Sequence, residues 1–164
     1  MSMEFTVELK GDIDLAIVLE KLQLAVITLL NIPTRPNIVT MSSSKQRSSL
    51  RNVGESATFL IEGIAEASLS IQDLPYDESD PLITKPLIVI SAGSLRSELS
   101  WVCVIALAIV TADMQRTTIT DDAHLIGNST ELCPKEIFEA IRLTHSQEDM
   151  LDASRSLLRK LGLL

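Results

Sequence analysis

The spacing of apolar and polar positions along the chain predicts strands near both ends of two long apolar helices. In residues 5–9 every second residue is apolar, a period of two that is typical of a half-buried strand. A helix is expected over 12–30, with Asp12 as its N-cap and Pro33 beyond its end. Because this helix is apolar on most sides, we expect it to be buried on most sides or covered by a partner.

The middle third of the chain has the pattern of short strands and polar loops. A short strand is predicted at 38–41, followed by a polar loop over 42–49. Segments 57–61 and 67–71 predict a hairpin with Gly63 in its turn, because the second segment alternates apolar and polar residues. A single helix over 56–71 is the competing interpretation. Residues 75–81, rich in proline and acid, are expected to form a loop.

Residues 87–122 form the unit around which the rest is expected to pack. A buried strand at 87–90 leads through a Ser-Ala-Gly turn into a long apolar helix, which Ser94 or Ser97 can cap. A second strand is predicted at 117–120. The spacing of its apolar residues places this helix in the core.

Two further helices are predicted at the C-terminus. Pro134 suits the first turn of a helix that runs to about residue 143. Ser146 and Asp149 form a capping pattern before an amphipathic last helix, and Gly162 is a good residue for its end.

The order of elements predicts a single α+β domain over 1–164. We expect a mixed or antiparallel sheet with two long buried helices on one face and a C-terminal helical pair. The segments 5–41 and 87–120 share a β-α-β outline, which makes a ferredoxin-like arrangement one option. A doubly wound sheet is less favoured, because the middle third has the pattern of consecutive strands.

Composition and charge exclude several classes of function. The net charge of -8 opposes binding to nucleic-acid phosphates, and an aromatic content of 3% offers few stacking platforms. Cys103 and Cys133 are too few for a disulfide framework or a zinc site, and we expect reduced thiols. The N-terminus has no secretory pattern, and the apolar runs fall short of a membrane span. A soluble, cytoplasmic protein without cofactor or metal is therefore expected.

An acidic segment without lysine or arginine extends over residues 55–80. It is either a solvated strand face with a loop, or a recognition surface for a basic protein, since opposite charge accelerates encounter. Tyr76 could anchor such a surface, because aromatic residues are enriched at binding hot spots. The candidate partner-binding residues are Glu62, Glu66, Asp73, Tyr76, Asp77, Glu78 and Asp80.

Other polar groups are weaker candidates for chemistry. Asp121, Asp122 and His124 follow a predicted strand and could bind a metal or a small ligand, but neighbouring residues of an extended chain point to opposite faces. A polar turn is the simpler interpretation. The turn at 91–94 could offer backbone N–H groups to an anion, yet it lacks a phosphate-binding motif. The basic residues Arg35, Lys45, Arg47 and Arg51 are more typical of a solvated loop than of a nucleic-acid site.

The residues VIALAIVTADMQRTTITDDAHL, 104–125, resemble a pattern in small bacterial proteins. An alanine-rich helix, a short strand and an acidic turn are similar to those of toxin-immunity proteins and related uncharacterised α/β domains. The glycine pair that often precedes the strand in such proteins is replaced here by Gln115 and Arg116. The resemblance implies a small cytoplasmic binding protein and assigns no functional residue.

The sequence therefore favours a non-enzymatic binding protein, an acidic immunity protein that neutralises a basic toxin. One alternative is a small-ligand enzyme or sensor with its site at Asp121, Asp122 and His124. Another is a structural oligomer, a homodimer in which the apolar first helix packs on a second copy. No catalytic motif is visible, so whether the chain is an enzyme stays open.

Overall fold

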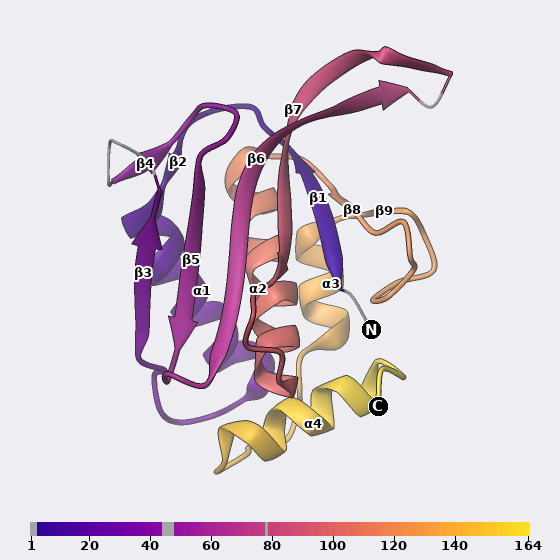
Figure 1. Ribbon diagram of the computed structural model, residues 1–164. Coiled ribbons are helices and arrows are strands. Elements are labelled where there is room, and N and C mark those ends of the chain that lie inside the picture. The colour runs from indigo at the N-terminus through magenta and orange to yellow at the C-terminus, as the bar shows by residue number, and fades with distance from the viewer. Residues whose placement is uncertain (1–2, 44–47, 78) are drawn as a thin grey trace.

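The protein is an antiparallel sheet with helices packed on one face (Figure 1). The computed structural model describes residues 3–43, 48–77 and 79–164, with the backbone alone at 76 and 77. The helices are α1 (Leu15–Leu30), α2 (Glu98–Gln115), α3 (Pro134–Ile141) and α4 (Met150–Lys160). The strands are β1 (Glu4–Glu8), β2 (Ile13–Asp14), β3 (Ile38–Ser42), β4 (Ser49–Leu50), β5 (Ser56–Ile61), β6 (Ala65–Asp77), β7 (Asp80–Ala92), β8 (Ile119–Thr120) and β9 (Glu131–Leu132).

The main sheet has the strand order β3-β5-β6-β7-β1-β8-β9, and every neighbouring pair is antiparallel. Helix α2 connects β7 to β8, which flank β1 and are therefore parallel to each other. Helix α1 connects β1 to β3 at the far edge of the sheet. These two crossings are the β-α-β outlines expected from the sequence. The α+β fold class is confirmed, with an antiparallel sheet.

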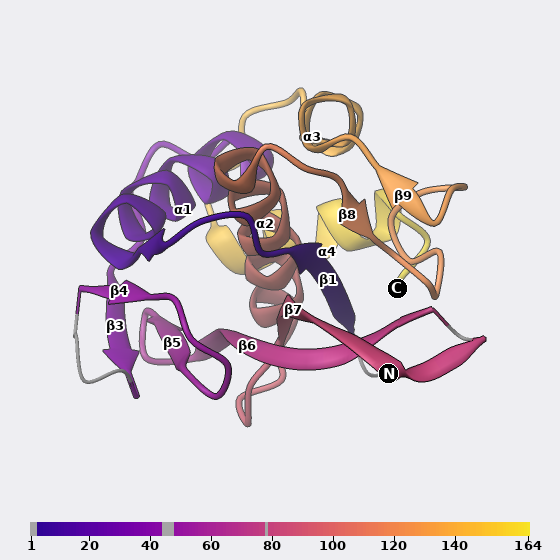
Figure 2. The same ribbon diagram turned by 90° about the horizontal axis from the view of Figure 1, so that it is seen from above.

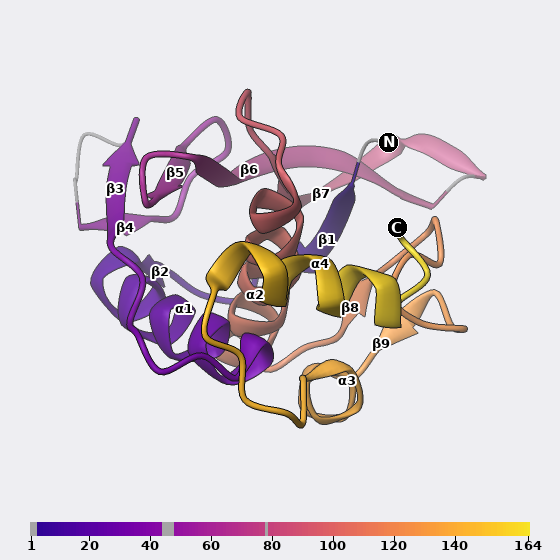
Figure 3. The ribbon, with the colours of Figure 1, turned by 90° about the horizontal axis from the view of Figure 1, so that it is seen from below.

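Helix α2 is buried almost all round because it lies between two layers. The sheet covers one side of it, and α1, α3 and α4 surround the others (Figures 2 and 3). The sheet contributes fully buried residues such as Phe5, Phe59, Leu69 and Ile90 to this core. Each such side chain stabilises the fold by about 1.5–3 kcal/mol. By length and composition α2 could cross a membrane, but 78% of the stretch is buried inside the fold, as in the core helix of a globular protein.

The hairpin expected in the middle third is confirmed. Strands β5 and β6 pair from Ser56↔Ser70 to Ile61↔Ala65. Glu62 and Gly63 both have positive φ, 52° and 70°, as a tight turn between two strands requires. The single helix over 56–71 is therefore wrong.

The first helix starts later than expected. Asp14, and not Asp12, is its N-cap, because the Asp14 side chain accepts hydrogen bonds from the N–H groups of Ala16 and Ile17. The preceding residues form β2, which pairs with β4 and holds them extended. Asp12 instead forms an ion pair with Arg51 at 3.0 Å. The polar loop predicted at 42–49 contains residues 44–47, which lie outside the described residues.

The acidic loop predicted at 75–81 is also wrong. Strands β6 and β7 continue through most of it, with Leu74 opposite Lys85 and Pro75 opposite Thr84. Proline suggested a loop, but a strand tolerates it where its missing N–H would face an open edge. Ser97, one of the two serines expected to cap α2, is its N-cap. Helix α4 is capped by Asp149 and not by Ser146, with which the expected capping pattern begins.

Candidate functional site: the β6–β7 arm

Strands β6 and β7 extend beyond the sheet as a two-stranded ribbon. The last pairing of β7 with β1 is Leu87 with Glu8, so residues 73–77 and 79–86 have no third strand beside them. We call these residues the β6–β7 arm. In Figure 1 the arm projects past the end of the sheet and twists away from the body. A ribbon of this kind gains little stability from its own two strands.

Prolines stand on both edges of the arm. The backbone of Ile71 bonds to the β5 side, since its N–H donates to Glu55 and its carbonyl accepts from Gly54. Because backbone groups alternate between the two edges of a strand, the backbone of Pro75 faces the same edge of β6 as that of Ile71. Strand β5 does not reach Pro75, so this edge is open there. Pro86 lies opposite Asp73 and by the same alternation faces the other edge. Neither position can donate to an added strand, so the arm presents side chains and not a sheet edge.

The exposed side chains of the arm combine apolar and acidic groups. Leu82 is 91% exposed and Ile83 56%, which makes Leu82 the most exposed of the large apolar residues whose burial is described. The Asp73 carboxylate accepts a hydrogen bond of 2.8 Å from Thr84 Oγ1 across the ribbon. The Asp80 carboxylate accepts from the backbone N–H of Leu82 at 3.2 Å. Both carboxylates are thereby oriented while remaining near solvent.

The charge of the arm is strongly negative. Residues 73–86 contain three aspartates and Glu78, against a single cation, Lys85. Lys85 Nζ lies 3.9 Å from a Glu8 carboxylate oxygen, so it is itself compensated. Glu78 lies outside the described residues, and Tyr76 and Asp77 are placed by their backbone alone.

Glu62 and Glu66, the first two candidate residues, lie at the other end of β6. Eleven strand positions separate Glu66 from Asp77, a distance of about 35 Å in an extended chain. Glu62 Oε1 accepts from the N–H of Asn37 at 2.7 Å. Glu66 Oε2 accepts from Ser94 Oγ at 3.1 Å and from the N–H of Leu95 at 3.4 Å. The candidate acids therefore form no single patch, and these two hold loops of the protein itself.

The same contacts account for the turn at 91–94. The hydroxyl of Ser94 and the N–H of Leu95 donate to the carboxylate of Glu66, a residue of the same chain. Gly93 lies so close to this carboxylate that a Cβ at position 93 would collide with it. The turn is thus a packed internal contact.

Asp121, Asp122 and His124 do not converge. The Asp121 side chain is fully buried and accepts hydrogen bonds of 2.9 Å from the N–H groups of Leu125 and Ile126. Asp122 and His124 are exposed, and His124 has a positive φ of 51° in the turn. Within the described residues no group of three His, Cys, Asp or Glu side chains is placed to hold a metal ion. The small-ligand alternative thus gains no support from this cluster.

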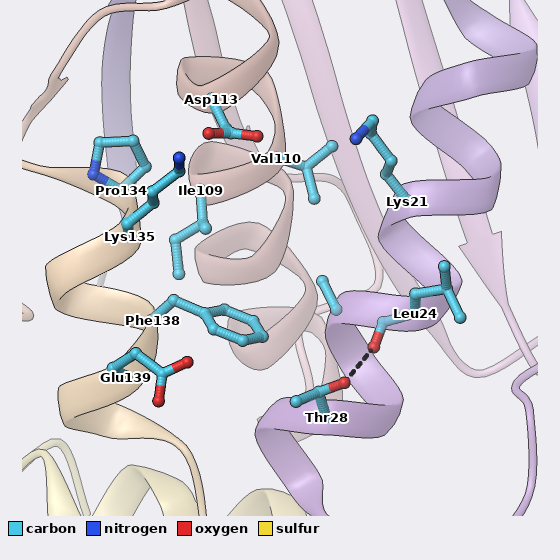
Figure 4. Close-up of a pocket in the computed structure, with 11 residues that line it drawn as sticks. Lys21, Leu24, Thr28, Ile109, Val110, Asp113, Pro134, Lys135, Phe138 and Glu139 are labelled. Atoms are coloured by element: carbon cyan, nitrogen blue, oxygen red, sulfur yellow. Dashed lines mark hydrogen bonds between the residues drawn. The ribbon is translucent and has the colours of Figure 1, made fainter.

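A groove that the sequence did not reveal lies between α1, α2 and α3. It has a volume of about 490 Å³, within the usual range for a small-molecule site. Figure 4 shows apolar side chains around the groove and polar side chains at both ends of the view, with Asp113 in the upper part and Thr28 and Glu139 in the lower part. The apolar side chains are those of Leu24, Ile109, Val110 and Phe138. The residues that line the groove come from three helices that are distant in sequence, so only the tertiary arrangement brings them together.

Taken together, the fold and the arm define a class: an α+β protein with an antiparallel sheet and a projecting acidic hairpin that exposes Leu82 and Ile83 on β7. Comparison of the chain with known protein families, with characterised proteins and with solved structures gives no match.

Proposed function

We propose that this chain is a non-enzymatic protein-binding module, an acidic immunity protein that neutralises a basic toxin by docking its β6–β7 arm on the toxin surface. The observation that carries this proposal is the arm, which combines net negative charge with the two exposed apolar residues Leu82 and Ile83. A cytoplasmic location goes with it, in keeping with the free thiols of Cys103 and Cys133.

The composition of the arm suits a basic partner. Its aspartates would attract a surface of lysine and arginine and speed the encounter, most strongly at low salt. Leu82 and Ile83 would then bury apolar area against the partner, where most of the binding free energy arises. Because Pro75 and Pro86 lack a backbone N–H on the two edges of the arm, contact through side chains is favoured over addition of a strand.

The proposed contact set is centred on the arm. It consists of Asp73, Tyr76, Asp77, Glu78 and Asp80, with Leu82 and Ile83 added from the structure. Glu62 and Glu66 are assigned to anchoring the Asn37 and Ser94 loops, because their carboxylates already accept backbone and hydroxyl hydrogen bonds.

The test needs a basic toxin as the binding partner, and the products of the neighbouring genes are the first proteins to screen for one. Reversal of Asp77, Glu78 and Asp80 to lysine should weaken binding at least tenfold and abolish protection of cells that express the toxin. The matched control reverses Asp122, Glu131 and Glu148, three exposed acids away from the arm, and changes the net charge equally. Unchanged affinity in the arm variant, or equal loss in both variants, would refute the arm as the contact surface.

Leu82→Ser provides a second, uncharged test. The side chain is almost fully exposed, so the substitution should leave the free energy of unfolding unchanged within about 0.5 kcal/mol. If Leu82 enters a pocket on the partner, the dissociation constant should rise about tenfold or more, largely through faster dissociation. Leu95→Ser, at an exposed leucine outside the arm, is the control.

A further inference from the structure

The groove between α1, α2 and α3 has an apolar lining that is still partly exposed to water. Helix α2 contributes Ile109 and Val110, and Figure 4 shows Leu24 of α1 and Phe138 of α3 on opposite sides. Leu24 is 46% exposed, although three helices surround the groove. A volume of about 490 Å³ gives room for a small molecule, which would remove this apolar surface from water.

The polar groups at the lower end of the groove already have partners within the chain. Thr28 Oγ1 donates to the carbonyl of Leu24 at 2.9 Å, a bond within α1 that is drawn in Figure 4. The Glu139 carboxylate forms an ion pair with the guanidinium of Arg142 at 3.0 Å. Because neither group needs a partner from a ligand, an apolar part of a ligand suits this end.

The upper end of the groove carries charges without such partners. Figure 4 shows Lys21 and Lys135 there, on opposite sides of Asp113. None of these three takes part in an ion pair among the residues that the structure describes. A second hollow adjoins this end, since Asp113, Pro134 and Lys135 line both, and it adds Arg116. Three cations and one carboxylate therefore lie at this end, which attracts an anion although the net charge of the protein is -8.

We propose that the groove binds a small amphiphile, a monocarboxylate with an unbranched aliphatic chain. Its carboxylate accepts charge-assisted hydrogen bonds from the ammonium groups of Lys21 and Lys135. Its chain lies along Leu24 and Phe138 and ends near Thr28. At 1.5 Å per residue, the helix from Lys21 to Thr28 is about 10 Å long, roughly the length of an extended eight-carbon chain.

The charges select the head group of this ligand. An amine with the same chain is attracted by Asp113 alone and repelled by Lys21, Lys135 and Arg116, and an alcohol gains no ionic contact. The inference is independent of the proposed function, because no residue that lines the groove belongs to the β6–β7 arm.

The test is titration of the full chain with octanoate, measured by calorimetry. Octylamine and octan-1-ol carry the same chain with a positive or a neutral head, and acetate carries the carboxylate without the chain. Octanoate should bind saturably, at least about tenfold more tightly than each of these three. The methyl NMR signals of Leu24, Ile109 and Val110 should shift during the titration. No saturable binding of octanoate, equal binding of octylamine, or shifts confined to residues outside the groove would overturn the proposal.

A pair of charge variants tests the contacts of the head group. Lys21→Gln combined with Lys135→Gln should weaken octanoate binding about tenfold and leave the weak binding of octan-1-ol unchanged. Arg96→Gln combined with Arg159→Gln is the matched control, because it removes the same charge at exposed positions that do not line the groove. An equal loss of octanoate binding in both double variants would overturn the assigned site.

A pair of apolar variants tests the contacts of the chain. Leu24 and Ile17 are both about half exposed on α1, but only Leu24 lines the groove. Leu24→Asp should weaken octanoate binding about tenfold or more, whereas Ile17→Asp should not, and both should keep the wild-type circular dichroism. Equal binding by the two variants would overturn the proposal. So would a dimer of the ligand-free chain that Leu24→Asp alone dissociates, since a second copy would then occupy the groove.

Discussion

The side-chain amide of Gln115 forms hydrogen bonds with the backbone of Gly11, which lies 104 positions earlier in the chain. Gln115 Oε1 accepts from the N–H of Gly11 at 2.9 Å and from that of Lys10 at 2.6 Å, while its Nε2 donates to the Gly11 carbonyl at 3.2 Å. Gln115 is only 6% exposed. One buried side chain thus joins the end of α2 to the turn that follows β1.

Gln115→Ala should therefore destabilise the fold. It leaves two N–H groups and a carbonyl of the turn without their partner, a cost of about 1–3 kcal/mol. Gln72→Ala, at an exposed glutamine, is the control and should change stability by no more than about 0.5 kcal/mol. Urea unfolding followed by circular dichroism measures both variants. An equal loss in the two would mean that the accepted bonds contribute nothing.

Asp121 and Asp122 are adjacent but should respond differently to the same change. Asp121→Asn replaces one acceptor of the buried pair of hydrogen bonds to Leu125 and Ile126, at a cost of about 1–3 kcal/mol. Asp122→Asn is exposed and should change stability by no more than about 0.5 kcal/mol. The comparison separates a structural carboxylate from a solvated one. Similar losses in both unfolding curves would contradict the structure.

The fold was largely predictable because its signals are local. The alternation in 67–71 and the apolar helix over 98–115 each depend on residues close in sequence, and both elements appear. The β6–β7 arm was missed because Pro75 and Pro81 indicate a loop, and only the pairing of β6 with β7 shows that strands run through both positions. The helix cap was misplaced because β2 pairs with β4, which no local pattern shows.

The candidate site was predictable only in part, for the same reason. Acidic residues are visible in sequence, but their separation along a 13-residue strand is not. Glu66 has the same charge as Asp73, and only the contact with Ser94 reveals its different role. The exposed Leu82 could have been noticed as an apolar residue beside an acidic run. The groove with Phe138 depends wholly on tertiary packing.

The two thiols should differ sharply in reactivity. Cys103 is fully buried, and burial raises its pKa to about 12, whereas Cys133 is exposed. At pH 8 a thiol reagent should modify one cysteine per native chain, and two in denaturant. Cys133→Ser should leave no reactive thiol in the native protein. Rapid modification of Cys103 in that variant would show that the core opens locally.

Burial of Cys103 also makes stability depend on pH. The folded pKa lies above the value of 9.0 for a free thiol, so the unfolded state loses its proton first as the pH rises. The contribution of the protonated thiol is complete below pH 9 and is lost as the pH rises toward 12. Unfolding curves across this range should fall more steeply for the wild type than for Cys103→Ala. Parallel curves would contradict the assigned burial.

The last prediction separates the β6–β7 arm from the fold that carries it. Leu74 and Lys85 lie directly opposite each other, so residues 75–84 can be replaced by Asn-Gly, which closes a two-residue hairpin. The removed residues include the exposed Leu82 and Ile83. The shortened chain should keep its cooperative unfolding transition and lose no more than about 1 kcal/mol, since few buried contacts disappear.

This shortened chain should also lose the partner proposed for the arm, because the removed residues include Asp77, Glu78, Asp80, Leu82 and Ile83. A shortened chain that still neutralises the toxin would place the contact elsewhere on the molecule. A shortened chain that no longer folds would mean that the arm stabilises the sheet, a role for which its exposure to solvent gives no basis.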